Sequence, residues 1–85
     1  MNAVVRFQAD DFDVTSGWLT LGSDDHRCHV NLGEISSWRY AVGDGVLTIV
    51  GTGITFVVTG PADDYETTNE LDRALWAALV EGGAA

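Results

Sequence analysis

The segment between residues 42 and 61, VGDGVLTIVGTGITFVVTGP, constrains the fold most, because it sets β-branched runs between regularly placed glycines. Two triplets, Gly43-Asp44-Gly45 and Gly51-Thr52-Gly53, each separate two apolar runs. Short β-branched runs joined by three residues that include glycine are typical of strands connected by tight hairpin turns. The segment therefore predicts a meander of three strands, at residues 35–42, 46–51 and 54–59.

The same glycines raise the alternative of a phosphate-binding loop. Such a loop needs a helix N-terminus directly after its glycines, because the backbone amides and the helix dipole bind the anion together. Here Gly53 is followed by ITFVVT, which is a strand pattern, and the chain contains no lysine. We therefore expect hairpin turns, with no nucleotide site and no cofactor.

Three further β-type runs precede the meander. Residues 3–9 alternate apolar and polar side chains, as in a half-buried strand. Residues 17–22 and 27–32 are two short runs on either side of SDDH, whose serine and aspartates favour a turn, so the pair predicts a hairpin. We interpret the acidic segment DDFDVTSG, which follows the first run, as a turn.

A helical period replaces the strand pattern after Pro61, which cannot donate a hydrogen bond to a sheet. One apolar stripe predicts a helix over residues 64–81. The stripe consists of Leu71, Leu75, Ala78 and Leu79. Thr67 and Glu70 match a capping box, while the acidic residues before them equally allow a start one turn earlier. Gly82-Gly83 supplies the stop signal.

We interpret the 85 residues as one domain, 1–85. The order of its predicted strands and helix resembles that of a known family over nearly the whole chain. The matching parts are the strands from Val30 to Thr59, with Leu32, Ile35 and Trp38 in an L-x-x-I-x-x-W run, and the helix from Thr68 to Val80. This pattern resembles a pleckstrin-homology-like domain, particularly the compact bacterial versions. The resemblance implies an α+β fold in which a strongly bent antiparallel sheet of six to seven short strands forms a partial barrel, capped by one C-terminal amphipathic helix. The same periodicities also allow a generic α+β sheet with one helix on its face.

The resemblance also bears on ligands. Members of that family that bind phosphoinositides use basic residues on the loop between their first two strands. At the corresponding place this chain has Asp10, Asp11 and Asp13, whose charge opposes a lipid headgroup. What the resemblance implies instead is the family's other habit, the binding of protein segments at the sheet edge or beside the helix.

The charge of the chain limits the classes of molecule that it can bind. The formal net charge is −9, which repels nucleic-acid backbones and anionic membranes. Cys28 is the single cysteine, so no internal disulfide supports the fold, and a reducing compartment follows. The chain also shows neither a signal-peptide pattern nor an apolar run long enough to span a membrane. We expect a cytoplasmic protein that binds neither nucleic acid nor membranes.

Candidate catalytic and metal-binding groups lie mainly in the segment from Asp24 to His29. Imidazole, thiolate and carboxylate groups are zinc ligands, but in a strand His29 points to the face opposite Cys28 and His26. The same geometry separates Cys28 from a histidine base. The aspartates of DDFD lack the glycine and the distal glutamate of a calcium loop. We therefore expect no enzyme and no metal site.

Two surfaces remain as candidates for binding a protein. An apolar one consists of Val46, Val50, Val57 and Trp76. The three valines belong to an uncharged, β-branched face that packs on a partner or a second copy, unless the sheet curves so sharply that this face joins the core. The acidic one consists of Asp10, Asp11, Asp13, Asp24, Asp25, Asp63, Asp64, Glu66, Glu70 and Asp72. These acids complement a basic partner, unless they serve only solubility and the helix dipole.

These observations predict a small, acidic, non-catalytic protein-interaction module that self-associates and binds a protein partner. The alternative is an acidic inhibitor, of the anti-CRISPR, immunity-protein or nucleic-acid-mimic type, that blocks a basic nucleic-acid-binding site on its target. Small size, high negative charge and the lack of catalytic groups fit both, and the second implies a phage or bacterial origin.

Overall fold

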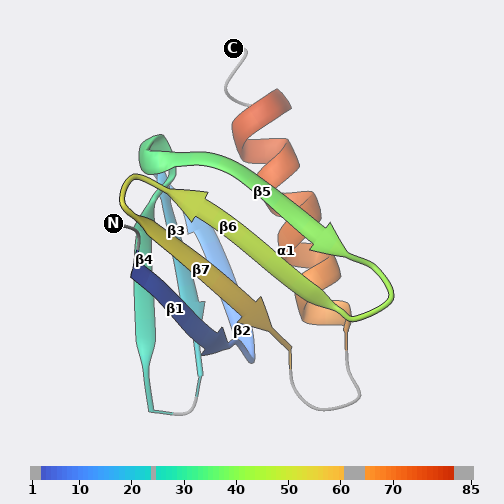
Figure 1. The fold of residues 1–85 in the computed structure, drawn as a ribbon. Helices are drawn as coiled ribbons and strands as arrows, with labels where there is room; N and C mark the ends of the chain where they lie inside the picture. The colour runs from blue at the N-terminus through green and yellow to red at the C-terminus, as the bar shows by residue number, and fades with distance from the viewer. Residues whose placement is uncertain (1–2, 24, 61–64, 82–85) are drawn as a thin grey trace.

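The computed structural model describes residues 3–23, 25–60 and 65–81. Within these residues seven strands precede one C-terminal helix, as Figure 1 shows. The strands are β1 (Ala3–Gln8), β2 (Asp11–Thr15), β3 (Trp18–Gly22), β4 (Arg27–Asn31), β5 (Ile35–Ala41), β6 (Val46–Gly51) and β7 (Ile54–Thr59). The helix α1 (Glu66–Trp76) continues into a π-helical segment, Ala77–Glu81, and a 3₁₀ turn, Leu32–Glu34, joins β4 to β5.

The described strands form two sheets. One has the order β1-β7-β6-β5, and the other has the order β2-β3-β4. The predicted α+β fold, a bent arrangement of short strands with a C-terminal helix, is confirmed, and the two sheets do not close into a barrel. The predicted meander is β5-β6-β7, and the predicted hairpin is β3-β4. One ladder departs from the expected antiparallel pairing, because β1 runs parallel to β7.

The chain changes sheets between β1 and β2. The amide of Ala9 donates to the carbonyl of Thr59 in one sheet, and the amide of the next residue, Asp10, donates to the carbonyl of Gly22 in the other. The interpretation of DDFDVTSG as a turn is therefore wrong, since its residues 11–15 form β2 and only residues 16–17 form a turn. Phe12 and Val14 turn toward the core while the residues between them face solvent, so the strand tolerates its aspartates.

The core lies between the inner faces of the two sheets and the helix. Leu19 and Leu21 come from β3, and Leu47 and Ile49 come from β6. Each of these side chains is fully buried. The helix adds Leu71 and Leu75 from its apolar stripe, which confirms the predicted face. The helix α1 contacts β2, β5 and β6, so it covers the open side between the two sheets (Figure 1).

The helix begins at Glu66, directly after Tyr65. Thr67 therefore lies inside the first turn and does not cap the helix, so the capping-box prediction is wrong. Of the acidic residues that favoured an earlier start, Glu66 is the first residue of the helix. The hydroxyl of Thr68 donates to the carbonyl oxygen of Tyr65 at 3.1 Å. The predicted first residues of the helix and its stop signal at residues 82–83 lie outside the described residues.

Candidate protein-binding groove

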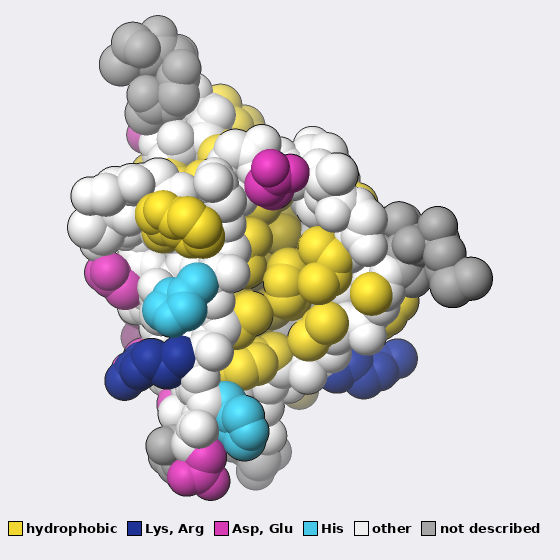
Figure 2. Space-filling view, turned by 90° about the vertical axis from the view of Figure 1, so that its left-hand side faces the viewer, with side chains coloured by type: hydrophobic (Ala, Val, Ile, Leu, Met, Phe, Trp, Pro, Cys, Tyr) yellow, Lys and Arg dark blue, Asp and Glu magenta, His cyan; other side chains and the backbone are white. Residues whose placement is uncertain are grey.

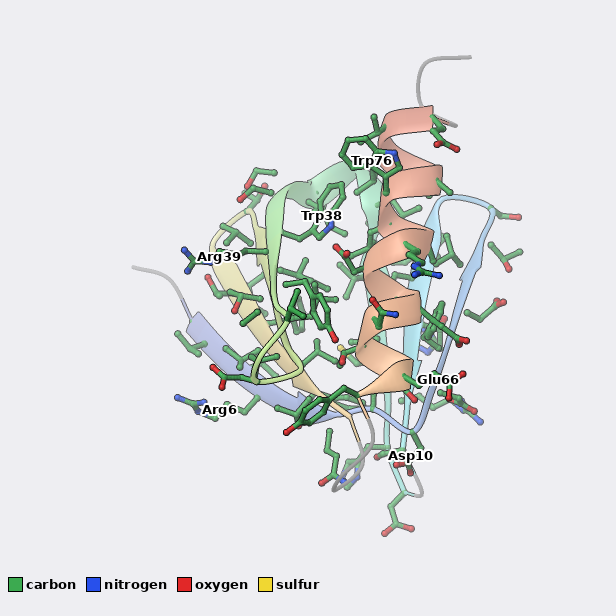
Figure 3. All side chains as sticks on the ribbon, turned by 90° about the vertical axis from the view of Figure 1, so that its right-hand side faces the viewer. Arg6, Asp10, Trp38, Arg39, Glu66 and Trp76 are labelled. Carbon is green, nitrogen blue, oxygen red and sulfur yellow. The ribbon has the colours of Figure 1, made fainter. Side chains whose placement is uncertain are left out.

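A groove of about 430 Å³ lies between the edge of β5 and the helix. Its walls are Ser36, Ser37 and Trp38 on β5, and Asp72 and Trp76 on α1. Figure 3 shows the two tryptophans on neighbouring elements at the same end of the molecule, with Trp38 pointing toward the helix. Among the described strands β5 pairs only with β6, so its other edge faces this groove without a partner strand.

Trp38 holds the two walls of the groove together. Its side chain is half-buried on β5 and packs against the core. The indole Nε1 donates to Oδ1 of Asp72 at 2.9 Å. A hydrogen bond from an indole to a carboxylate is charge-assisted and stronger than a neutral one. The bond fixes the distance between β5 and the second turn of the helix.

Trp76 gives the groove an exposed aromatic wall. Leu75 beside it is fully buried, whereas the side chain of Trp76 is 55% exposed. Successive helical residues point about 100° apart, so a buried leucine places the next side chain at the margin of the helix. Large exposed aromatic side chains next to a groove are typical anchors in protein interfaces.

A second, separate hollow lies near the start of the helix. It is lined by Tyr40, Val42, Tyr65, Glu66 and Asn69. The hydroxyl of Tyr40 donates to the carbonyl oxygen of Tyr65 at 3.5 Å. The strand predicted over residues 35–42 ends at Ala41, so Val42 lies just beyond β5 and is 78% exposed. Exposed apolar side chains therefore border both the groove and this second hollow.

The predicted acidic residues do not gather at one place. Asp11 and Asp13 lie on the outer face of β2, Asp10 at the change of sheets and Asp25 in the β3–β4 turn, all of them exposed. Glu66 and Glu70 are exposed on the helix, and Figure 3 shows Asp10 and Glu66 at the same end of the molecule. Asp24, Asp63 and Asp64 lie outside the described residues.

Some of the described acids already have partners. Asp72 is half-buried and accepts the hydrogen bond from Trp38. Asp11 lies 3.9 Å from Nη1 of Arg27, across Gly22, where a side chain would collide with both groups. The hydroxyl of Thr15 donates to Oδ2 of Asp13 at 2.7 Å. Both partners of the ion pair are exposed, so water screens it and it adds little to stability.

The predicted apolar surface divides into two separate places. Val46 and Val50 on β6 and Val57 on β7 lie on the outer face of their sheet, where all three are partly exposed. No described element covers this face, so it is not part of the core. Trp76 lies on the helix, which packs against the inner face, and it belongs to the groove instead.

Cys28 and His29 face opposite sides of β4, as the strand pattern predicted. Cys28 faces inward on β4, while His29 faces outward and its Nδ1 lies 3.1 Å from the hydroxyl of Thr20. Within residues 3–23, 25–60 and 65–81, no three histidine, cysteine or acidic side chains are grouped so that they could hold one metal ion. Burial raises the pKa of the Cys28 thiol above its ordinary value of 9.0.

We expect this thiol to react slowly in the folded protein. Because burial favours the protonated thiol, at pH 8 iodoacetamide should alkylate Cys28 at least about threefold more slowly in native protein than in urea. The raised pKa also makes stability depend on pH. The stabilisation of the folded state that comes with a protonated Cys28 thiol is fully present below the ordinary pKa, and it is lost as the pH rises through the raised pKa of the folded state. Mass spectrometry of timed samples measures the alkylation, and equal rates in both conditions would contradict the expectation.

The comparisons with protein-family models, with curated proteins and with solved structures find no match to this chain. The pleckstrin-homology-like resemblance therefore stays a prediction, and the groove has to be interpreted from its own chemistry. None of the described helices is long and apolar enough to cross a membrane.

Proposed function

We propose that this chain is a non-catalytic protein-interaction module that binds an extended segment of a partner in the groove between β5 and α1. The observation that carries the proposal is the exposed Trp76 opposite Trp38, beside a strand edge that lacks a partner strand within the described residues. A peptide that lies along such an edge gains affinity from main-chain hydrogen bonds, and pockets for every second side chain give specificity.

The groove favours a partner with apolar and basic side chains. Tryptophan surfaces bury large apolar areas at interfaces. The carboxylate of Asp72 accepts from Trp38 through one oxygen, and a carboxylate has further acceptor sites for a donor from the partner. The net charge of −9 also accelerates encounters with a basic protein. The bound segment is therefore expected to combine an apolar anchor with lysine or arginine.

Trp76→Ala tests the groove, with Trp18→Ala as its matched control. Trp18 is 48% exposed on the outer face of β3, so both changes remove an exposed indole, but only one lines the groove. Immobilised wild-type and variant proteins capture partners from native lysate, and quantitative mass spectrometry compares them. We expect Trp76→Ala to lower retention of a specific partner at least tenfold, a typical effect of removing an interface anchor.

The comparison between the two variants decides the outcome. Trp18→Ala should retain the same partner as the wild type, because its surface lies outside the groove. A partner lost equally from both variants, or a wild type that retains nothing above an unrelated acidic control, would contradict a binding function for this groove.

The proposal includes self-association through the outer face of β6 and β7. The partly exposed valines there form an apolar strip between Arg6 on β1 and Arg39 on β5, and burying such a strip between two copies removes apolar surface from water. Val50→Lys should convert a concentration-dependent dimer into a monomer in sedimentation analysis, while Val80→Lys on the helical segment leaves the dimer intact. A wild type that sediments as a monomer at every concentration would contradict this part.

An acidic inhibitor is the second candidate, because two neighbouring elements, β2 and α1, both carry exposed acids. Asp11 and Asp13 on β2 and Glu70 on α1 are exposed, and β2 packs against the helix. Such a protein competes with nucleic acid for a basic site on its target. Asp13→Lys combined with Glu70→Lys should then abolish the inhibition of nucleic-acid binding by the target, together with the salt dependence of that inhibition, without unfolding the chain. Unchanged inhibition would show that these acids do not contact the target.

A further inference from the structure

A second opening lies on the side of the molecule opposite the β5–α1 groove. β1 is the last strand of one sheet and β4 is the last strand of the other, and the two strands do not pair. Figure 2 shows apolar side chains uncovered in a hollow at this side, next to the face that carries both histidines. We call this opening the β1–β4 hollow.

The floor of the β1–β4 hollow consists of core-facing side chains. Val5 and Phe7 from β1 and Cys28 from β4 all pack against the buried core cluster, yet each remains partly exposed. Their counterparts further along the same sheets, such as Leu21 and Val58, are fully buried. The difference arises because no described element covers the space between these two edges, whereas α1 covers the opposite opening.

The rim of the hollow offers backbone hydrogen-bonding groups. Ala3 and Ala9 donate toward β7, and every second residue of a ladder turns its backbone to that neighbour. The alternate residues Val4, Arg6 and Gln8 therefore turn their amides and carbonyls to the free side of β1. An edge strand of this kind is a template for pairing with another extended chain.

The charge beside the hollow differs from that of the molecule as a whole. Arg6 is exposed in the middle of β1, and Arg27 and His29 are exposed on β4. Arg27 already faces Asp11 at 3.9 Å. A cavity of about 460 Å³ at the end of β1 is lined by Arg6 and His26, together with Asp10 and Asp25. Arg6 is the cation in the middle of the open edge, and it shares this cavity with the two acids near the end of the strand.

We propose that the edge of β1 binds an extended segment of a partner protein, whose alternate apolar side chains cover Val5, Phe7 and Cys28 and whose carboxylate pairs with Arg6. Backbone pairing orients the segment, and burial of the apolar floor supplies affinity. An arginine that meets a carboxylate at a partly desolvated edge adds specificity through charge-assisted hydrogen bonds.

A second copy of this chain fits the edge less well. β1 has the sequence AVVRFQ, which contains no acidic residue, so pairing β1 with β1 of another copy brings Arg6 no counter-charge. An acidic, apolar segment of a different protein supplies that counter-charge at Arg6.

This surface is distinct from the β5–α1 groove in both position and charge. The groove presents Asp72 and two tryptophans, whereas the β1 edge presents Arg6 and the apolar side chains Val5 and Phe7. A chain that uses both surfaces holds two different segments on opposite sides. Trp76→Ala tests only the groove and Arg6→Glu only the β1 edge, so failure of either proposal is recognisable separately.

Fluorescein-labelled decapeptides test the proposal directly. Each peptide alternates valine and threonine and carries a single aspartate, which is moved through the central positions from one peptide to the next. A matching peptide with lysine in place of the aspartate accompanies each one. We expect fluorescence polarisation to show saturable binding of an aspartate peptide to the full chain, with the lysine counterpart at least tenfold weaker. Arg6→Glu should reverse this preference, while Arg39→Glu, an exposed arginine on β5, should leave it unchanged.

Two further measurements test the backbone pairing. Gln8→Pro removes an amide that faces the free side, which an edge strand tolerates, and it should abolish binding while the thermal unfolding curve persists. Peptides N-methylated at alternate amides test the same contact without altering the protein. Two such peptides are compared, one methylated at the odd-numbered amides and one at the even-numbered amides, and we expect only one of the two to bind. Equal binding of aspartate and lysine peptides, no binding by any peptide, or tolerance of both methylation phases would overturn the proposal. A β1-dependent dimer that Arg6→Glu strengthens would assign the edge to a second copy instead.

Discussion

Leu75→Ala is expected to lower the free energy of unfolding by about 2–5 kcal/mol, the usual range for emptying a fully buried leucine site. Leu75 is 0% exposed and is one of two fully buried leucines by which the described helix enters the core. The helix covers the open side between the sheets, so the cavity forms where two sheets and a helix meet. Urea unfolding followed by tryptophan fluorescence measures the change.

The neighbouring residue supplies the control for this experiment. Trp76→Ala removes a larger side chain, but one that is 55% exposed, so it should cost less than about 1 kcal/mol of stability. The two adjacent substitutions then separate the roles of the helix, one in stability and one in binding. A loss below about 1 kcal/mol for Leu75→Ala would contradict the placement of the helix against the core.

Gly45→Ala is expected to destabilise the fold by about 2 kcal/mol, through backbone strain and through a steric collision. The same substitution at Gly53 and Gly43 distinguishes these two effects. Gly45 has a φ of +66°, which strains a residue with a side chain, and a Cβ there would collide with the ring of Tyr65. Gly53 has a φ of +74° with nothing within 4 Å, so Gly53→Ala should cost about 1 kcal/mol from backbone strain alone.

Gly43 completes this series. It belongs to the same turn as Gly45, but its φ is not in the left-handed region and nothing lies within 4 Å of an added Cβ. Gly43→Ala should therefore change stability by no more than about 0.5 kcal/mol, or raise it slightly by restricting the unfolded chain. Equal costs at all three positions, in the same urea titration, would contradict the conformation of this turn.

The sequence predicted the elements whose local pattern is strong. Glycine-bearing triplets between β-branched runs predicted β5-β6-β7 because turn geometry and strand propensity are local properties. The leucine stripe predicted the buried face of α1 for the same reason. Strand β2 was missed because its aspartates were given more weight than the alternation of Phe12 and Val14, which was visible in the sequence.

The sequence could not predict contacts between distant elements. The parallel pairing of β1 with β7 depends on how the sheets fold together, and neither strand encodes its partner locally. The bond from Trp38 to Asp72 joins residues 34 positions apart, so no spacing rule connects them. Asp72 was assigned to an acidic surface because a carboxylate on a helix is usually solvated, and only the position of β5 makes it part of the groove.

The parallel ladder between β1 and β7 has a consequence for the order of folding. Ala3 pairs with Ile54, about 50 positions later, so this ladder closes a long loop, whereas β2-β3-β4 and β5-β6-β7 form from neighbouring segments. Contacts of long sequence separation slow folding, because the entropy of the loop is lost before the contact is gained. During synthesis β1 emerges first but cannot join its sheet until β7 has left the ribosome. The first strand made is therefore among the last to be incorporated, and a chaperone has the longest access to the strand that ends the sheet.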